Sequence, residues 1–144
     1  MRAEVPDAAR GIYCAGRLTI GIGGAITSRH YVDLNGDVTI GRMTIVAGVR
    51  STLLTHSIDL GKSCQRVSKI TIGDYVFVGT NSVILSGASI PDQSVIAAGS
   101  LVRGVLSSSW SLYGGVPARW LRSVDHSSKY FTRSDPYVEW GEEV

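Results

Sequence analysis

One of the three histidines in this 144-residue sequence, His56, stands in the setting Thr55-His56-Ser57-Ile58-Asp59. A free imidazole has a pKa near 6.5, so a large share of it is neutral at physiological pH and able to accept a proton. Such a group can remove the proton of a hydroxyl while that oxygen attacks a carbonyl carbon. His56 is therefore a candidate general base, and the alternative is a solvated loop histidine. Whether Asp59 orients the ring is left open by the spacing.

Two arginines near the end of the sequence, Arg119 and Arg122, follow Pro117. Proline suits the first turn of a helix, so we predict a short helix here. Residues three apart lie on one face of a helix, and two guanidiniums on one face can hold a phosphate group. A solvated basic helix is the alternative.

A six-residue repeat must position these groups. β-Branched aliphatic residues recur at every sixth position, at Ile72, Val78, Ile84, Ile90, Ile96 and Val102. A second column follows the first five of them by four residues, at Val76, Ser82, Ala88, Ser94 and Ser100. An α-helix with 3.6 residues per turn cannot hold this period on one face, whereas short strands joined by turns can. The pattern therefore predicts stacked coils with the aliphatic column inside and with glycines at tight corners, such as Gly21, Gly41, Gly73 and Gly79.

The same spacing continues upstream at Ile20, Ile26 and Val32, and again at Ile40, Val46 and Thr52. The phase slips between these triplets, and we expect loops to leave the coil at the slips. His56 follows Thr52 at such a junction and precedes a polar segment, 60–69, that must loop out. The candidate base is thus expected where coil meets loop.

The run from Ile72-Gly73-Asp74-Tyr75-Val76-Phe77-Val78-Gly79 to Val102 resembles the hexapeptide-repeat acyltransferases, and the resemblance covers roughly residues 18 to 124. It implies an all-β fold, a left-handed parallel β-helix of hexapeptide repeats with a short C-terminal helix and tail. The expected organisation is an N-terminal segment over 1–17, the β-helix over 18–104 with a loop near 57–69, and a terminal turn, short helix and aromatic tail over 105–144.

The Thr55-His56 setting resembles the Thr-His motif of the O-acetyltransferases of this family, where the histidine is the general base. The segment 112–122 resembles the signature that closes the acyl-CoA-dependent members. The resemblance implies acetyl-CoA as co-substrate, no permanently bound cofactor, and a groove between subunits of a homotrimer. It implies coenzyme A contacts at Gly79, Thr80, Ala97, Ala98, Arg103, Arg119 and Arg122. The Thr80 backbone N–H is the candidate oxyanion donor, and His30, Asn35 and Phe77 are candidate acceptor contacts.

The function expected from this resemblance is transfer of an acetyl group from acetyl-CoA to a hydroxyl of a saccharide or polysaccharide precursor. An N-acyltransferase acting on an amino-sugar, an antibiotic acetyltransferase and a non-catalytic scaffold subunit are the alternatives. The family's carbonic anhydrases bind zinc through three histidines. Because His56 has no histidine five residues later, no metal site is expected.

Charge and hydropathy limit the kinds of partner and the location that we expect for the protein. The sequence has 14 Lys and Arg against 12 Asp and Glu, a net charge of +2, and the basic residues are scattered, so no nucleic-acid partner is expected. The first ten residues lack an apolar stretch and the longer uncharged segments are broken by polar residues, so we expect neither signal peptide nor membrane span and a cytoplasmic location. Cys14 and Cys64 are then expected to be free thiols.

Overall fold

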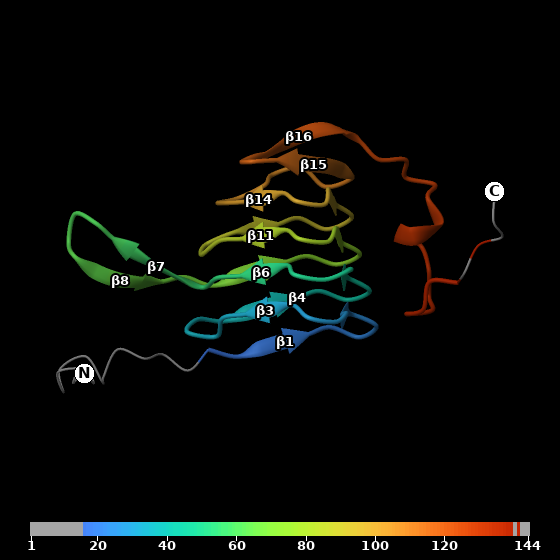
Figure 1. Ribbon diagram of the computed structural model, residues 1–144. Helices are drawn as coiled ribbons and strands as arrows, with labels where there is room; N and C mark the ends of the chain where they lie inside the picture. The colour runs from blue at the N-terminus through green and yellow to red at the C-terminus, as the bar shows by residue number, and fades with distance from the viewer. Residues whose placement is uncertain (1–15, 140, 142–144) are drawn as a thin grey trace.

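The computed structural model describes residues 16–139 and 141, which wind into a stack of coils (Figure 1). Each coil contributes three short strands. The first two coils contain β1 (Leu18–Ile20), β2 (Ala25–Ile26), β3 (Tyr31–Val32), β4 (Val38–Ile40), β5 (Ile45–Val46) and β6 (Thr52–Leu53). The next two contain β9 (Ile70–Ile72), β10 (Phe77–Val78), β11 (Val83–Ile84), β12 (Ser89–Ile90), β13 (Val95–Ile96) and β14 (Leu101–Val102). Residues 1–15, with Cys14 and most of the predicted N-terminal segment, lie outside the described residues.

Equivalent strands of successive coils pair in parallel and form three sheets. Sheet A has the order β1-β4-β9-β12, sheet C the order β14-β11-β6-β3, and sheet B contains β13-β10-β5-β2 with two further strands at its top. The chain passes through sheets A, B and C in turn, so it has an A–B, a B–C and a C–A corner in each coil. The predicted all-β class, a left-handed parallel β-helix, is confirmed.

The core is the predicted pair of columns. The six aliphatic residues from Ile72 to Val102 are each at most 1% exposed, and so are all five members of the second column: Val76, Ser82, Ala88, Ser94 and Ser100. Close stacking of the coils explains the glycines that follow the aliphatic residues. A Cβ on Gly79 would lie 2.6 Å from the backbone nitrogen of Ala98 in the next coil. The left-handed backbone position at the A–B corner is occupied by Gly23 in the first coil and by Met43, Tyr75 and Gln93 in the later coils.

The predicted inward position of Thr52 is wrong, because Leu53 takes it. Leu53 is fully buried and aligns with Val32 and Ile84, whereas Thr52 aligns with the outward residues Tyr31 and Val83. From Val46 to Leu53 is seven residues rather than six, and the longer corner contains Gly48 and Arg50, both with positive φ. The phase slip therefore occurs one corner before His56.

A hairpin leaves the stack between β6 and β9, and it is the form taken by the predicted loop near 57–69. Its strands β7 (His56–Asp59) and β8 (Cys64–Val67) are antiparallel, with His56 opposite Val67 and Ile58 opposite Gln65. Figure 1 shows this hairpin projecting away from the coils. His56 thus lies at the base of the projecting arm.

The predicted short helix after Pro117 is wrong. Ala118–Ser123 forms β16, which pairs antiparallel with β15 (Ser111–Gly115) after a turn with a cis Val116–Pro117 peptide and a positive φ at Gly115. β15 continues sheet B above β13, and its free edge offers backbone donors and acceptors that a second strand satisfies and a helix would not. The only helical element among residues 16–139 is the short 3-10 helix η2 (Lys129–Phe131), and no described helix is long and apolar enough to cross a membrane.

The tail after β16 runs back along the A–B corners, and we call residues 126–137 the strap. Figure 1 shows it beside the coils, on the side away from the hairpin. The Tyr130 hydroxyl donates to the Val76 carbonyl at 2.9 Å, and the Tyr75 hydroxyl donates to the Arg133 carbonyl at 3.1 Å. Arg133 in turn donates to the carbonyls of Tyr130 and Met43. The strap therefore ties the second and third coils together.

Candidate functional site

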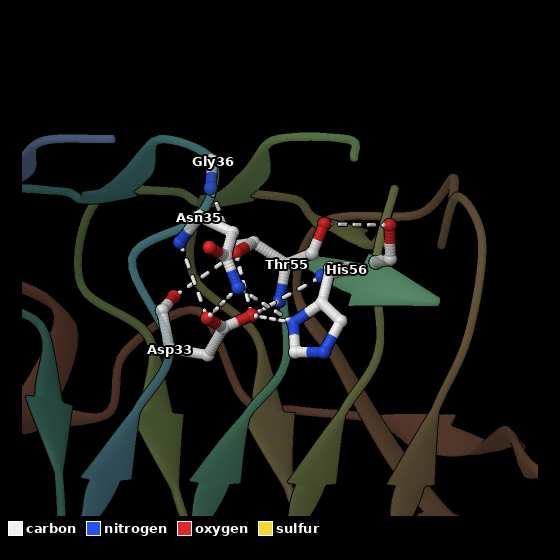
Figure 2. A network of polar contacts seen from close by, with 6 residues as sticks. Asp33, Asn35, Gly36, Thr55 and His56 are labelled. Atoms are coloured by element: carbon white, nitrogen blue, oxygen red, sulfur yellow. Dashed lines mark hydrogen bonds and ion pairs between the residues drawn. The ribbon is translucent and has the colours of Figure 1, made fainter. Parts of the chain in front are cut away.

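Asp33 and His56 meet at the C–A corner, although they are 23 residues apart in the sequence. Asp33 directly follows β3 in the first coil, and His56 begins β7 at the same corner one coil later. The Nδ1 atom of His56 lies 2.6 Å from Oδ2 of Asp33 (Figure 2). This pair is the nucleus of the site.

The carboxylate of Asp33 is held by a set of donors. Oδ2 also accepts hydrogen bonds from the Thr55 backbone N–H at 2.9 Å, the Thr55 hydroxyl at 2.8 Å and the His56 backbone N–H at 3.2 Å. Oδ1 accepts from the backbone N–H and the side-chain amide of Asn35, at 3.1 and 2.8 Å. Burial by itself raises the pKa of Asp33, but the hydrogen bonds, first that from His56, hold the pKa well below its ordinary value. Asp33 is therefore ionised at neutral pH.

The ionised acid fixes the tautomer of the base. Asp33 can only accept a hydrogen bond, so Nδ1 of His56 carries the hydrogen between them. In the neutral ring, Nε2 then holds the free lone pair. The His56 side chain is 36% exposed while Asp33 is 6% exposed, so the ring can be reached although its partner is buried. This arrangement suits proton abstraction at Nε2.

The neighbours of the pair form a rigid support. The Thr55 hydroxyl accepts from the Gly36 backbone N–H at 2.9 Å, and the Thr55 carbonyl accepts from the Ser86 hydroxyl at 3.0 Å. Asn35 Nδ2 lies 3.0 Å from Nδ1 of His56 as well, but since Nδ1 directs its hydrogen to Asp33, the amide donates to Asp33 instead. Asn35 is thus beside the base, and its role as an acceptor contact stays a prediction.

Asp59, the acid considered from the sequence, does not orient His56. Its carboxylate accepts from the Lys62 backbone N–H at 3.1 Å and lies 3.6 Å from the Arg66 guanidinium. Asp33 was missed because no local spacing links it to His56. The sequence does contain a signal, because Val32 and Leu53 are equivalent inward residues of successive coils. Asp33 directly follows Val32 and His56 comes three residues after Leu53, so both lie at the same corner.

A second group of residues, which includes the predicted Gly79 and Ala97, lies at the B–C corner. Ala47, Gly79 and Ala97 directly follow β5, β10 and β13, and each donates its backbone N–H to the next strand up the stack, at 2.8–2.9 Å. Gly114 of β15 continues this series above Ala97. We call these four residues the small-residue column. No member has a side chain larger than methyl; Ala47 and Ala97 are half-buried, and Gly79 and Gly114 are buried.

Arg119 lies at the top of the small-residue column, opposite Gly114. Trp120 is opposite the inward residue Tyr113, and its indole N–H donates to the buried Ser111 hydroxyl at 3.1 Å. A β-bulge then absorbs one residue, so that Arg122 is opposite the outward residue Leu112. The two arginines therefore share the outward face, as predicted, but through a bulge in a strand rather than through a helix.

The other predicted residues divide between the corners. Thr80 is fixed at the B–C corner, where its hydroxyl accepts from the Val49 N–H at 3.0 Å and donates to the Val49 carbonyl at 2.8 Å. Ala98 and His30 lie at the same corner, and the His30 Nδ1 accepts from the Ser51 N–H at 3.1 Å. Arg103 is exposed at the C–A corner, two coils above His56.

Phe77 faces outward on sheet B. Its ring packs edge-on against Tyr130 of the strap with centroids 5.9 Å apart. The histidines are separated, with His30 at the B–C corner, His56 at the C–A corner, and His126 stacked on Trp110. Across residues 16–139 and 141, no three His, Cys, Asp or Glu side chains are grouped to hold a metal ion.

Comparison with known proteins agrees with the repeat and the coil. Residues 69–103 match the family described as hexapeptide repeat of succinyl-transferase. The chain is 35% identical to galactoside O-acetyltransferase of Escherichia coli (strain K12) over 106 residues, 71% of this chain and 52% of that protein. It is 29% identical to mitochondrial gamma carbonic anhydrase 1 of Arabidopsis thaliana over 91 residues, 62% of this chain and 33% of that protein.

Among solved structures, the fold is similar to that of the hexapeptide-repeat-containing acetyltransferase VCA0836 from Vibrio cholerae in complex with acetyl coenzyme A. The TM-score is 0.69 at 31% identity, over 75% of this chain and 61% of that one. The chain spans about half the length of the first curated relatives that it matches. On its repeat, its three-sheet coil and these similarities, the chain contains the hexapeptide repeat and is similar to the hexapeptide-repeat acetyltransferases.

Proposed function

We propose that the protein transfers an acetyl group from acetyl-CoA to a hydroxyl of a saccharide or polysaccharide precursor, with His56 as the general base. The observation that carries the proposal is the 2.6 Å contact between His56 Nδ1 and the ionised, buried Asp33. A surface histidine without a catalytic role needs no such partner. Similarity to a galactoside O-acetyltransferase and to a structure with bound acetyl-CoA supports the choice of donor and acceptor.

The proposed reaction is direct transfer. Nε2 of His56 removes the proton of the acceptor hydroxyl as its oxygen forms a bond to the thioester carbonyl carbon. Asp33 stays ionised and stabilises the imidazolium that forms. The tetrahedral oxyanion accepts a hydrogen bond from the Thr80 backbone N–H. When the carbon–sulfur bond breaks, the electron pair leaves on sulfur and the Nε2 proton neutralises the thiolate of coenzyme A.

The small-residue column is the proposed track for the donor's pantetheine arm. From Ala47 to Arg119 there are four strand steps, about 19 Å at about 4.8 Å per step. The side chains of the column are no larger than methyl, so they leave room for an extended, amide-containing chain to lie along the corner. Arg119 and Arg122 supply outward positive charge at its end, where the phosphates of coenzyme A would lie.

The proposal requires more than one copy of the chain. Within one chain, the small-residue column lies at the B–C corner, where the strands of sheet C begin, and His56 lies at the C–A corner, where they end. The base of one chain is then available to the donor on another. We propose the homotrimer implied by the family resemblance, with each site shared between two chains, and a cytoplasmic location. His30 and Phe77 stay predictions as acceptor contacts.

The test is His56→Ala, with His126→Ala as the control because His126 stacks on Trp110 outside both groups. Release of free coenzyme A thiol is measured with acetyl-CoA and a mixed sugar pool, and products are identified by mass spectrometry. His56→Ala should lower turnover by about 10²- to 10⁴-fold and leave acetyl-CoA affinity unchanged. Turnover near the wild-type rate would show that His56 is not the base. Loss of the product's acetyl group in hydroxylamine separates an ester from an amide and so O- from N-transfer.

A further inference from the structure

Two backbone N–H groups at the B–C corner have no acceptor in the part of the chain that the structure describes. They belong to Thr80 and Ala98, which are both exposed. The N–H groups on either side of Thr80 are paired, since Gly79 donates to the Ile96 carbonyl at 2.8 Å and Asn81 donates to the Val49 carbonyl at 2.9 Å. The corner therefore presents single donors to the outside while its other N–H groups hold the coils together.

The equivalent N–H groups at the A–B corner are paired within the protein. Arg42 and Asp74 come two residues after an inward residue, as Thr80 and Ala98 do. The Arg42 N–H donates to Oδ1 of Asp74 and the Asp74 N–H donates to Oδ1 of Asp92, both at 2.7 Å. At the B–C corner the residue above Thr80 is Ala98, whose methyl group cannot accept a hydrogen bond. The residue type at this position thus decides whether the donor below it stays available.

Buried serines fix the direction in which these donors point. The Ser82 hydroxyl donates to the Gly79 carbonyl at 2.8 Å, and the Ser100 hydroxyl donates to the Ala97 carbonyl at 2.6 Å. Both serines are at most 1% exposed. The Gly79 carbonyl and the Thr80 N–H belong to one planar peptide unit and point in opposite directions. Because Ser82 holds the carbonyl towards the core, the Thr80 N–H is directed outward.

Ser82 is the principal donor to the Gly79 carbonyl. Among the described residues no backbone N–H donates to this carbonyl, and its other contact is with the Ser51 hydroxyl at 3.5 Å. A buried carbonyl that loses its donor costs free energy, and glycine allows the backbone to rotate. Without the Ser82 hydroxyl, the peptide unit can turn its carbonyl towards water. That rotation would direct the Thr80 N–H away from the outside.

We propose that Ser82 is a positioning residue for acetyl transfer, which directs the Thr80 N–H at the thioester carbonyl. Ser100 directs the Ala98 N–H at the amide-containing arm of the donor in the same way. The orientation of the two N–H groups rests on the hydrogen bonds of the corner, and only its purpose rests on the proposed function. A donor stabilises an oxyanion best when it is oriented before the charge develops. Both serines act through the backbone, since their own side chains are buried.

The test compares alanine variants of two equally buried serines. Ser82→Ala removes the hydroxyl at the B–C corner. Ser94→Ala is the matched control, because Ser94 is also fully buried and donates to the Asp92 carbonyl at 3.3 Å, at the A–B corner. Since loss of a whole oxyanion donor costs about 10²- to 10³-fold in kcat, we expect Ser82→Ala to lower kcat by about 10- to 100-fold. The KM for acetyl-CoA should stay within about threefold, and Ser94→Ala should keep the wild-type kcat.

Two more variants separate positioning from packing. Ser82→Thr keeps the hydroxyl, and Thr44 at the equivalent place of the A–B corner donates to the Gly73 carbonyl of the next coil at 2.6 Å, so most of the lost kcat should return. Ser100→Ala should instead raise the KM for acetyl-CoA about three- to tenfold with kcat unchanged, as expected for one weakened hydrogen bond. A kcat of Ser82→Ala within about threefold of wild type overturns the proposal. An equal loss in Ser82→Thr or in Ser94→Ala overturns it as well.

The orientation is also measured without catalysis. In amide NMR spectra of the protein alone, the Thr80 resonance should shift in Ser82→Ala and stay in place in Ser94→Ala, and circular dichroism checks that the variants fold. If the wild-type chain transfers no acetyl group to any sugar, the proposed function fails and the Thr80 resonance alone decides the orientation. An unshifted resonance in Ser82→Ala overturns the proposal in either case. Should Ser82→Ala not fold, Ser100→Ala and the Ala98 resonance give the same comparison.

Discussion

Replacing Asp33 by asparagine tests both the chemistry and the energetics of the site. The carboxylate accepts from four donors on Oδ2 and from two on Oδ1. An asparagine can direct its one oxygen to the first set only, which leaves its amide against the two donors of Asn35. With the Asn35 amide free to rotate, one buried donor is left without an acceptor, and the expected loss of unfolding free energy is about 1–3 kcal/mol.

The loss should depend on pH in one direction. The pKa of Asp33 lies below its ordinary value of 3.8 in the folded protein. The wild-type carboxylate therefore contributes stability that is fully present above that value and is lost as the pH falls below it. The difference in unfolding free energy between wild type and Asp33→Asn should be constant from pH 7 to about pH 5 and should shrink towards pH 3. Urea unfolding at each pH measures it.

The same variant should slow acetyl transfer. Without the acceptor on Nδ1, His56 loses its fixed tautomer and the charge that stabilises the imidazolium, so kcat should fall by about 10²- to 10⁴-fold with the KM for acetyl-CoA unchanged. Asp59→Asn is the control, because Asp59 contacts Lys62 and Arg66 and not His56. A stability difference that is the same at pH 7 and pH 3, or a kcat within about threefold of wild type, would refute the reasoning.

Two further predictions concern the donor end and the strap. Arg119→Ala with Arg122→Ala should raise the KM for acetyl-CoA at least about tenfold, since each charged contact to phosphate is worth about 1.5–3 kcal/mol, while the KM for the sugar stays within twofold. Steady-state kinetics with both substrates varied measures the two constants, and an unchanged KM for acetyl-CoA would show that these arginines do not bind the phosphates. Arg133→Ala should lower the free energy of unfolding by about 2–3 kcal/mol, because two charge-assisted hydrogen bonds to carbonyls and a stacking contact on Tyr130 at 4.0 Å are lost. Thermal unfolding checks this, with exposed Arg122→Ala as control, and equal midpoints for the two variants would show that the strap does not stabilise the coils.

The six-residue period predicts the coils because each repeat packs only on its neighbours, so the inward residues are chosen locally. That is why the column from Ile72 to Val102 was placed correctly. Thr52 was misplaced because one additional corner residue near Gly48 shifts the phase without leaving a trace in the aliphatic pattern. The helix after Pro117 was wrong for a related reason. Local preference suggested a helix start, whereas the open edge of β15 determined the outcome.

The residues of the site also divide into those that the local sequence predicts and those that it does not. His56 was found from its position beside a break in the repeat, and Arg119 and Arg122 from their charge and spacing. Asp33 was missed because no local spacing links it to His56, and its place beside His56 follows only once Val32 and Leu53 are recognised as equivalent residues of stacked coils. The separation of His56 from the small-residue column was not predicted either, because it depends on which corner of the coil each group occupies.

The stacking of coils also fixes distances along the molecule in equal steps. One full coil advances the chain by a fixed step of about 4.8 Å along the stack, whatever residues it contains. Arg119 stands above Gly114, so its height over Ala47 is set by how many coils intervene and not by any side chain. Inserting a coil above β10 would lift the arginines by one step and leave Asp33 and His56 where they are. The distance from Ala47 to Arg119 can thus be changed in steps of one coil without disturbing the Asp33–His56 pair at the C–A corner.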